Sequence, residues 1–246
     1  MKVACVSTIM KCRINRSFDI AIQSVKSQTY KDFDIFICYS KEPFWLDDGI
    51  DIPPKIDGVN FVEVENNGCM RFIEYSLTNL LDYDYVMIFG TDCTIPDYML
   101  KMNIDYLESS EEKVCGVIGK KIVPYGWEYY NDIKTPTNVD VLSTVGICFK
   151  PKELINIGIL YWKRECPLAS MNDELWFNGC LARKGINRVM LPMNQFDIGT
   201  DKDNPISVTS YSKKLEWTIP IGISFYFRDY WEGFKNENSI RPKIEE

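Results

Sequence analysis

Apolar positions in the first half of the chain fall into two kinds of segment. Short apolar runs bounded by polar or turn residues predict buried strands at 3–7, 33–39, 59–64 and 85–89. Apolar residues at helical spacing predict helices at 15–28, 69–81 and 96–107. The run 85–89 is continuously apolar, which is typical of a strand buried on both faces. This alternation predicts an α/β fold with a mostly parallel central sheet flanked by helices.

The second half of the chain is less regular. Strands are predicted at 114–118, 139–149 and 189–191. A helix is predicted at 172–184, with Asn172 as its N-cap and Gly185 ending it. No internal repeat and no clear linker interrupts the pattern, so we expect one domain over 1–235 and a charged, frayed tail at 236–246.

Composition narrows the chemistry. The 246 residues carry 28 Lys and Arg against 35 Asp and Glu, a net charge of −7, which argues against general nucleic-acid binding. A local basic pocket for a phosphorylated ligand remains compatible with that balance. The chain has no histidine, which removes Ser-His-Asp and Cys-His catalysis and His-ligated zinc or iron. Acid–base catalysis must therefore use carboxylates, Lys, Tyr or Cys.

Cysteine usage and hydropathy bear on the compartment. The nine cysteines form no C-x-x-C pair, and several lie in apolar runs, which favours reduced and mostly buried thiols. No window approaches the ~18–20 apolar residues of a membrane helix, and the apolar start of the chain is too short for a signal peptide. We therefore expect a cytoplasmic protein without a transmembrane segment.

Aromatic side chains are concentrated near the end of the chain. We expect them to pack on the core or across a homodimer, and a peripheral contact with a membrane surface or an acceptor is the alternative. The acidic balance weakens the membrane alternative, because anionic lipids attract basic segments. These residues are Trp217, Phe225, Tyr226, Phe227, Tyr230, Trp231 and Phe234.

Ligands of open α/β sheets bind at the carboxyl ends of the strands, and two segments there are suited to a nucleotide. The segment after the first strand offers Ser7, Thr8 and Arg13 to a base and ribose. After the third strand, Asn67 precedes a glycine turn into a helix, and Arg71 lies in its first turn. A helix N-terminus beside an arginine favours phosphate, although an ordinary loop with a solvated arginine gives the same pattern.

Two further segments carry carboxylates. Thr91 and Asp92 follow the buried strand 85–89, a recurrent position for a metal or ribose ligand, although Asp92 is equally suited to cap the turn that follows. Asp173 and Glu174 open a predicted helix. The helix dipole stabilises negative charge there, so the pair is either an ordinary first turn or a general base held ionised.

Three of these segments, in this order, resemble the GT-A glycosyltransferases, in particular the family 2-like enzymes that use nucleotide sugars. They are AIQSVKSQTYKDFDI at 21–35, DYVMIFGTDCTIP at 84–96, and DELW at 173–176 followed by LARKGI at 181–186. The resemblance covers roughly 3–192 and implies a GT-A, Rossmann-like fold. It also implies a nucleotide-sugar half at about 1–110 and an acceptor half at about 111–235.

The resemblance implies sugar transfer from a nucleoside-diphosphate sugar to a hydroxyl of a glycan, lipid or protein, with inversion. Mn²⁺ or Mg²⁺ would bridge the phosphates to an acidic motif, in which Asp92 matches the last acid. Either Asp173 or Glu174 matches the base that deprotonates the acceptor. The second acid of the pair commonly fills that role in the family, which favours Glu174.

The family's acidic triplet is here Gly90-Thr91-Asp92, so two acids are missing. Three outcomes stay open: a metal held by Asp92 with phosphates and water, a metal-independent enzyme that uses Arg71 or Lys120 and Lys121, or a catalytically degenerate binding protein. For Lys120 and Lys121 themselves, a solvated pair is the simpler expectation. A nucleotidyltransferase ranks lower, because no Gly-rich phosphate loop follows the first strand.

Overall fold

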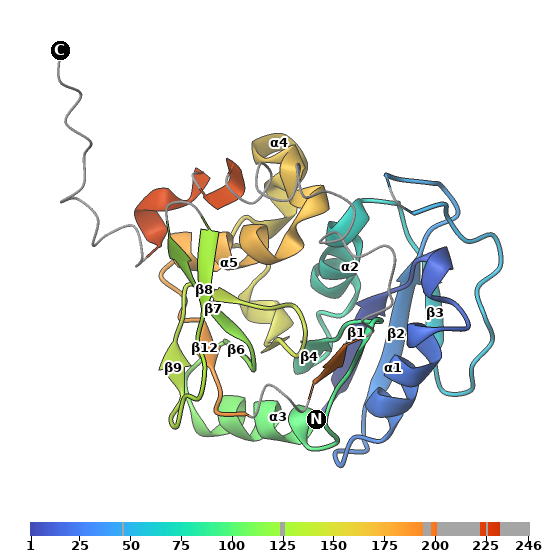
Figure 1. The fold of residues 1–246 in the computed structure, drawn as a ribbon, viewed down its shortest axis with the longest axis horizontal. Helices are drawn as coiled ribbons and strands as arrows, with labels where there is room; N and C mark the ends of the chain where they lie inside the picture. The colour runs from blue at the N-terminus through green and yellow to red at the C-terminus, as the bar shows by residue number, and fades with distance from the viewer. Residues whose placement is uncertain (46, 124–125, 194–197, 201–221, 225, 232–246) are drawn as a thin grey trace.

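The computed structural model describes residues 1–45, 47–123, 126–193, 198–200, 222–224 and 226–231. An eight-stranded sheet, in the order β3-β2-β1-β4-β11-β6-β12-β9, runs through it (Figure 1). The first four of these strands are parallel, and β6 also pairs in parallel with β12, whereas β11 and β9 run antiparallel to their neighbours. The predicted α/β fold with a mostly parallel sheet is confirmed.

The strands of this sheet follow the apolar runs of the sequence. They are β1 (Val3–Thr8), β2 (Asp34–Tyr39), β3 (Asn60–Glu63), β4 (Tyr85–Ile88), β6 (Val114–Gly116), β9 (Thr137–Asn138), β11 (Cys148–Phe149) and β12 (Val189–Met190). A second sheet contains β7 (Gly119–Val123), β8 (Gly126–Tyr129) and β10 (Val141–Leu142), and a third pairs β5 (Cys93–Thr94) with β13 (Gly199–Thr200).

Helices cover both faces of the large sheet. Helices α1 (Ser17–Lys26) and α3 (Met99–Ser109) pack on the face that receives Val3 and Cys5 of β1. Helices α2 (Arg71–Asn79) and α5 (Asp173–Arg183) pack on the face that receives Ala4 and Val6. Successive side chains of β1 thus enter opposite cores, which explains its unbroken apolar run.

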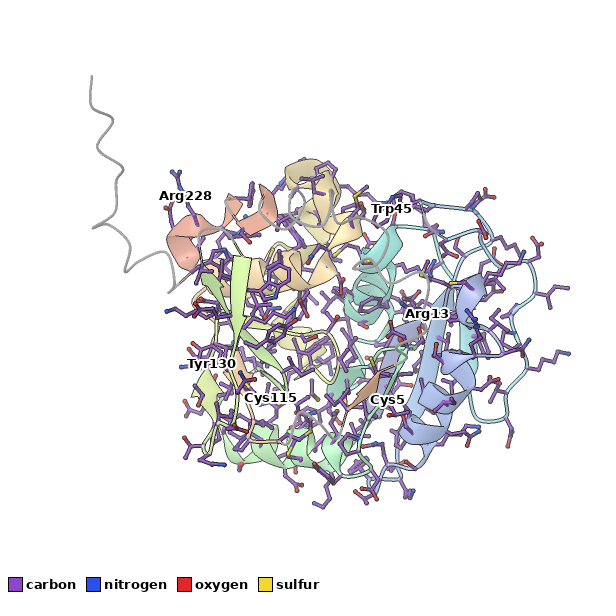
Figure 2. The ribbon with its side chains drawn as sticks, viewed as in Figure 1. Cys5, Arg13, Trp45, Cys115, Tyr130 and Arg228 are labelled. Carbon is purple, nitrogen blue, oxygen red and sulfur yellow. The ribbon has the colours of Figure 1, made fainter. Side chains whose placement is uncertain are left out.

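All nine cysteines are free thiols, and six of them are buried, as expected: Cys5, Cys38, Cys115, Cys148, Cys166 and Cys180. Cys5 on β1 and Cys115 on β6 both lie in the interior (Figure 2). Burial raises the pKa of each of these two thiols well above its usual value, so neither is a nucleophile at neutral pH.

Local signals explain where the helices begin and end. Helix α1 begins at Ser17 rather than at residue 15, because Asn15 has a left-handed backbone with φ of 59°. Helix α5 has the predicted cap: the Asn172 side chain accepts a hydrogen bond from the backbone amide of Leu175 at 3.0 Å. Gly185, with φ of 67°, follows that helix as predicted.

Gln28, the glutamine of the QTY segment, stabilises the packing of two helices. Gln28 is fully buried beyond the end of α1. Its amide nitrogen donates to the carbonyl of Pro96 at 2.8 Å, and its amide oxygen accepts from the backbone of Leu100 at 2.8 Å. Gln28 therefore joins the end of α1 to the start of α3.

In the middle of the chain the structure corrects one predicted strand and adds a hairpin. The segment 139–149 is not one strand: it forms β10 and β11, because Gly146 turns the chain with φ of 80°. A Cβ there would lie 2.7 Å from Sδ of Met99, so the turn also needs a residue without a side chain. Strands β7 and β8 form an antiparallel hairpin that the hydrophobic pattern did not indicate.

Several short helices lie between the longer elements. They are η1 (Lys11–Arg13), η2 (Gly68–Met70), η3 (Pro151–Glu153), η4 (Ile159–Tyr161), α4 (Trp162–Glu165) and η5 (Pro167–Met171). Gly68 in η2 has φ of 59°, and a Cβ on it would lie 2.2 Å from the carbonyl oxygen of Ser170 in η5. The short helices η2 and η5 therefore meet backbone against backbone at this point.

The last helix in the described part of the chain is η7 (Arg228–Tyr230). Phe227 and Trp231 are fully buried, and the Phe227 ring lies 5.3 Å from the Trp176 ring of α5, so the predicted core packing is confirmed for these two. Tyr226 and Tyr230 stay exposed. Trp217, Phe225, Phe234 and the predicted tail at 236–246 lie outside the described residues. Among the helices that the structure describes, none combines the length and apolar character needed to cross a bilayer.

Candidate functional site

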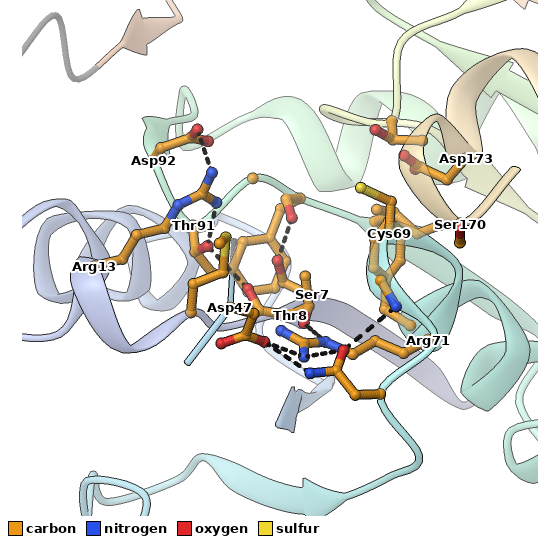
Figure 3. A pocket seen from close by; sticks show the side chains of 18 of the residues that line it. Ser7, Thr8, Arg13, Asp47, Cys69, Arg71, Thr91, Asp92, Ser170 and Asp173 are labelled. Carbon is orange, nitrogen blue, oxygen red and sulfur yellow. Dashed lines mark hydrogen bonds and ion pairs between the residues drawn. The ribbon is translucent and has the colours of Figure 1, made fainter. Parts of the chain in front are cut away.

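A cavity of about 220 Å³ opens where β1 and β4 end, between the parallel half of the sheet and the first turn of α5. Seven of the nine residues predicted from the sequence line it: Ser7, Thr8, Arg13, Arg71, Thr91, Asp92 and Asp173. Arg13 and Asp92 lie on one side, and Asp173 with Ser170 and Cys69 on the other (Figure 3). Asn67 and Glu174 do not line this cavity.

Hydroxyl groups lock the ends of β1 and β4 together. The Ser7 hydroxyl donates to the carbonyl of Phe89, and the Thr91 hydroxyl donates to the carbonyl of Thr8 at 2.9 Å. Both bonds join residues more than 80 positions apart in the sequence. The floor of the cavity is therefore a rigid junction of two parallel strands.

The Arg13 side chain reaches from η1 to the end of β4. Its Nη1 donates to the Thr91 hydroxyl at 2.8 Å, and its Nη2 lies 2.9 Å from Oδ2 of Asp92. The side chains of Arg13 and Asp92 are 15% and 27% exposed, so the pair is only partly screened by water. Nε of Arg13 is buried without a hydrogen-bond partner among the described residues.

The carboxylate expected to bind a divalent metal is paired with an arginine in this structure. Asp92, the predicted ligand, already forms an ion pair with the guanidinium of Arg13. Within the part of the chain that the structure describes, no group of three or more Cys, Asp or Glu side chains is arranged to hold a metal ion. A divalent cation beside Asp92 would also have to lie next to the positive charge of Arg13.

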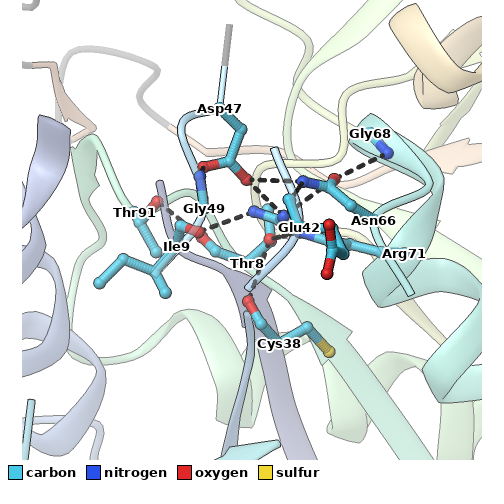
Figure 4. A network of polar contacts seen from close by, with 10 residues as sticks. All are labelled: Thr8, Ile9, Cys38, Glu42, Asp47, Gly49, Asn66, Gly68, Arg71 and Thr91. Atoms are coloured by element: carbon cyan, nitrogen blue, oxygen red, sulfur yellow. Dashed lines mark hydrogen bonds and ion pairs between the residues drawn. The ribbon is translucent and has the colours of Figure 1, made fainter. Parts of the chain in front are cut away.

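Arg71, the other arginine of the cavity, is enclosed by a polar network (Figure 4). Its Nε donates to the Thr8 hydroxyl, and its Nη2 donates to the carbonyl of Ile9 at 2.7 Å. Its Nη1 donates to Oδ2 of Asp47 at 2.5 Å and to Oδ1 of Asn66 at 3.2 Å. The side chain is 2% exposed. Through these hydrogen bonds Arg71 joins β1, the loop at Asp47 and the start of α2.

Asn67 faces away from the cavity. Its amide donates to Oε2 of Glu74 at 2.5 Å, and Oε1 of Glu74 in turn accepts from the indole of Trp162 at 2.7 Å. This chain of contacts joins α2 to α4. Asn67, which precedes the glycine turn, thus has a packing role and does not contact the cavity.

Asp173 points into the cavity from the first turn of α5 and is 9% exposed. Its Oδ2 is buried and has no hydrogen-bond partner among the described residues. Burial, followed by repulsion from Glu174, raises the pKa of Asp173 from its ordinary value to about 7, although hydrogen bonds from backbone amides at the start of α5 and from the Thr144 side chain act in the opposite direction. A carboxyl group with such a pKa is suited to accept a proton near neutral pH.

Glu174 has different surroundings. Its Oε2 forms an ion pair with Nζ of Lys120, and its Oε1 accepts from the backbone amide of Thr144 at 3.3 Å. Burial favours the neutral amine, but the Glu174 carboxylate raises the pKa of Lys120 above its ordinary value. Nζ also lies 5.2 Å from the Trp127 ring centre, so the expectation of a solvated Lys120 is wrong.

Several cavity residues escaped the sequence analysis. Asp47 holds Arg71, and Phe44 and Trp45 line the rim of the cavity. The backbones of Phe44 and Asp47 pair in both directions, at 2.9 and 3.0 Å, which presents the half-exposed Trp45 between them. In the sequence, Phe44 and Trp45 are visible as an aromatic pair inside a polar loop. The position of this loop at the cavity depends on the Arg71–Asp47 ion pair, which no local sequence pattern indicates.

By sequence, neither a family model nor a curated protein matches the chain. By structure, it is similar to residues 1–349 of S. aureus TarS, a GT-A family 2 glycosyltransferase, in complex with UDP. The TM-score is 0.50 at 11% identity, over 78% of this chain and 58% of that one. Another TarS structure gives 0.47 at 14% identity, over 72% of this chain and 34% of that one.

The chain thus spans less than two thirds of the length of these TarS structures. At such low identity the likeness concerns the fold: the mixed, mostly parallel sheet with its flanking helices is GT-A-like, as the resemblance implied.

Proposed function

We propose that this protein is an inverting glycosyltransferase that moves a sugar from a nucleoside-diphosphate sugar to a hydroxyl group of a glycan, lipid or protein. The observation that carries the proposal is the Asp173 carboxyl group. It has a raised pKa and an unpartnered oxygen, and it shares a cavity with the carboxyl ends of β1 and β4. The GT-A-like fold and the binding of UDP by TarS support a nucleotide donor at that edge.

Asp173, rather than Glu174, is the proposed general base. Glu174 is tied to Lys120 and does not line the cavity, whereas Asp173 does. In the transfer step the acceptor oxygen forms a bond to the anomeric carbon from the side of Asp173. The bond from that carbon to the diphosphate oxygen breaks, and its electron pair leaves with the nucleoside diphosphate. The acceptor proton passes to the Asp173 carboxylate, which balances the step.

Glu174 supports this role indirectly. Its negative charge beside Asp173 raises the pKa of that carboxyl group, while Lys120 neutralises Glu174. The Trp127 and Tyr129 rings stand 5.2 and 5.4 Å from Nζ of Lys120 and enclose the pair. Lys120 and Glu174 are therefore proposed as positioning residues and not as groups that contact the sugar.

The rim residue Trp45 offers an aromatic face to the ligand. It is 40% exposed, lines the same cavity and is fixed by the pairing of Phe44 with Asp47. A flat heterocycle such as a nucleotide base is a good partner for such a face. The base would then lie at the rim, with the diphosphate directed toward the ends of β1 and β4.

The test is a screen of UDP-, GDP-, dTDP- and CMP-linked sugars, with release of the free nucleotide as the readout. We expect one nucleotide class to be cleaved by the wild type and not by Asp173→Asn. A nucleotide that raises the melting temperature without being cleaved would instead support the alternative of a catalytically degenerate binding protein. If no member of the panel binds or reacts, the proposed function is excluded for these donors.

A further inference from the structure

The cavity contains a fixed cation at the place where the resemblance implies a metal. Two basic side chains among the described residues line it, Arg13 and Arg71. Arg71 is 2% exposed and donates to four oxygen atoms of the protein, those of Thr8, Asn66, Asp47 and Ile9. Its guanidinium is therefore committed to the fold, and Lys120 is likewise committed to Glu174.

Arg13 is less completely used. Nη1 and Nη2 contact Thr91 and Asp92, whereas Nε is buried and has no partner among the described residues. A guanidinium carries five N–H groups in a planar fork that matches two phosphate oxygens at once. Each Nη atom carries a second N–H beyond its contact with Thr91 or Asp92, so Arg13 retains donor capacity for an anion on a side chain that lines the cavity.

The contacts of Arg13 also fix its orientation. The Asp92 carboxylate holds one edge of the fork at 2.9 Å, and the Thr91 hydroxyl, itself bonded to the carbonyl of Thr8, holds the other. A charged group that is already oriented before the ligand binds loses little conformational entropy on binding. The acid at the strand end, which resembles a metal ligand in the sequence, thus orients a cation supplied by the chain.

We propose that Arg13, oriented by Asp92, binds the diphosphate of the donor in place of a divalent metal ion, so that donor binding needs no metal. This inference rests on the proposed function and names the group that receives the leaving diphosphate. As the bond to the anomeric carbon breaks, negative charge grows on the diphosphate oxygen. The Arg13 N–H groups donate hydrogen bonds to that charge, and Arg13 transfers no proton.

The experiment is a calorimetric titration of the wild type with UDP, GDP, dTDP and CDP, once in EDTA and once in excess Mn²⁺ or Mg²⁺. For the nucleotide that binds, we expect affinities within about threefold of each other in the two buffers. Arg13→Gln should weaken binding by about tenfold or more, and Arg13→Lys, which keeps the charge but loses the fork, should lie between. Lys11→Gln is the matched control, because Lys11 is an exposed cation of the same short helix and does not line the cavity.

The outcomes separate the two proposals. Binding that requires Mn²⁺ or Mg²⁺ in the wild type would overturn the role of Arg13 and leave the proposed function standing. Wild-type affinity in a folded Arg13→Gln variant would do the same. If Arg13→Gln does not fold, wild-type affinity of Arg13→Lys for the nucleotide that binds would overturn the proposed role of the guanidinium fork. Absence of binding by all four nucleotides in both buffers would overturn the proposed function itself.

Discussion

Asp173 and Glu174 are neighbours in the sequence, yet their carboxyl groups have opposite surroundings. Asp173 turns a buried, unpartnered oxygen toward the cavity, and Glu174 is ion-paired with Lys120 on another side of α5. Adjacent residues of a helix are separated by about 100° around its axis, so only one of the two can face the ligand. The division of labour between two acids follows from this geometry.

Replacement of Asp173 by asparagine should remove the base and keep the shape. Because a general base contributes typically 10²–10⁴-fold to a rate, we expect the turnover number to fall by about that factor while the affinity for the nucleotide stays within a few-fold. Single-turnover release of the nucleotide and calorimetric titration measure the two quantities. Equal losses in Asp173→Asn and Glu174→Gln, without loss of fold in either, would contradict the assignment of the base.

The pH dependence follows from the raised pKa of Asp173. Below about pH 7 the carboxyl group of the folded protein is protonated and cannot accept the acceptor's proton, so the turnover number should rise with pH and level off above about 7. A profile that is flat between pH 5.5 and 8, measured with the chemical step rate-limiting, would argue against Asp173 as the base.

The same carboxyl group couples stability to pH. In the unfolded chain an aspartate has a pKa of about 3.9, so between about pH 4 and 7 the folded state binds more protons than the unfolded state. The contribution of Asp173 to the free energy of unfolding is therefore fully present below about pH 4 and is lost as the pH rises to about 7. Asparagine is neutral at every pH, so urea unfolding should show the wild type losing stability relative to Asp173→Asn as the pH rises from about 4 to 7, with little difference below that range.

The buried ion pair of Arg71 and Asp47 offers a test of stability. Asp47→Ala leaves the guanidinium of Arg71 buried without its counter-charge, which we expect to lower the free energy of unfolding by about 3–5 kcal/mol. Glu63→Ala is the control, because the Lys41–Glu63 pair is half exposed and should contribute nothing measurable. Chemical denaturation measures the free energy of unfolding of both variants. An equally small decrease in both would contradict a stabilising role of the Arg71 network.

Two glycines with left-handed backbones allow the cost of backbone strain to be measured apart from the cost of a steric clash. Gly68 and Gly185 have φ of 59° and 67°, but only at Gly68 would a Cβ meet another atom, the carbonyl oxygen of Ser170 at 2.2 Å. Gly185→Ala should cost about 1–2 kcal/mol, the penalty of a left-handed residue with a Cβ. Gly68→Ala should cost clearly more, and thermal unfolding of the pair measures the excess.

The sequence predicted those parts of the fold that depend on local patterns. The strands β1, β2 and β4 and the cap at Asn172 could be identified because each has a signal within a few residues. The strand–helix order then placed Thr8 and Asp92 at one edge of the sheet. The hairpin of β7 and β8 was missed, because the burial of Lys120 depends on its ion pair with the distant Glu174 and on Trp127, and not on an apolar pattern in the strand.

The electrostatic partners could not be predicted, because each pair joins distant parts of the chain. Arg13 meets Asp92 across 79 positions, Arg71 meets Asp47 across 24, and Lys120 meets Glu174 across 54. A sequence identifies a charged residue but not the residue of opposite charge with which it pairs. The expected roles of Arg71, Lys120 and Glu174 changed for that reason, while the position of Asp173 at the cavity depended only on the start of a helix.

The contact between Gly68 and Ser170 has a consequence for how the site could have diverged. Main-chain atoms set the spacing of the two walls there, and no side chain separates them. Substitutions elsewhere on either wall can alter what the cavity accepts, but they leave the reach from the Arg13 side to the Asp173 side unchanged. Exchange of rim residues such as Trp45 can therefore change which ligand is bound, while the separation of Arg13 and Asp173 stays the same.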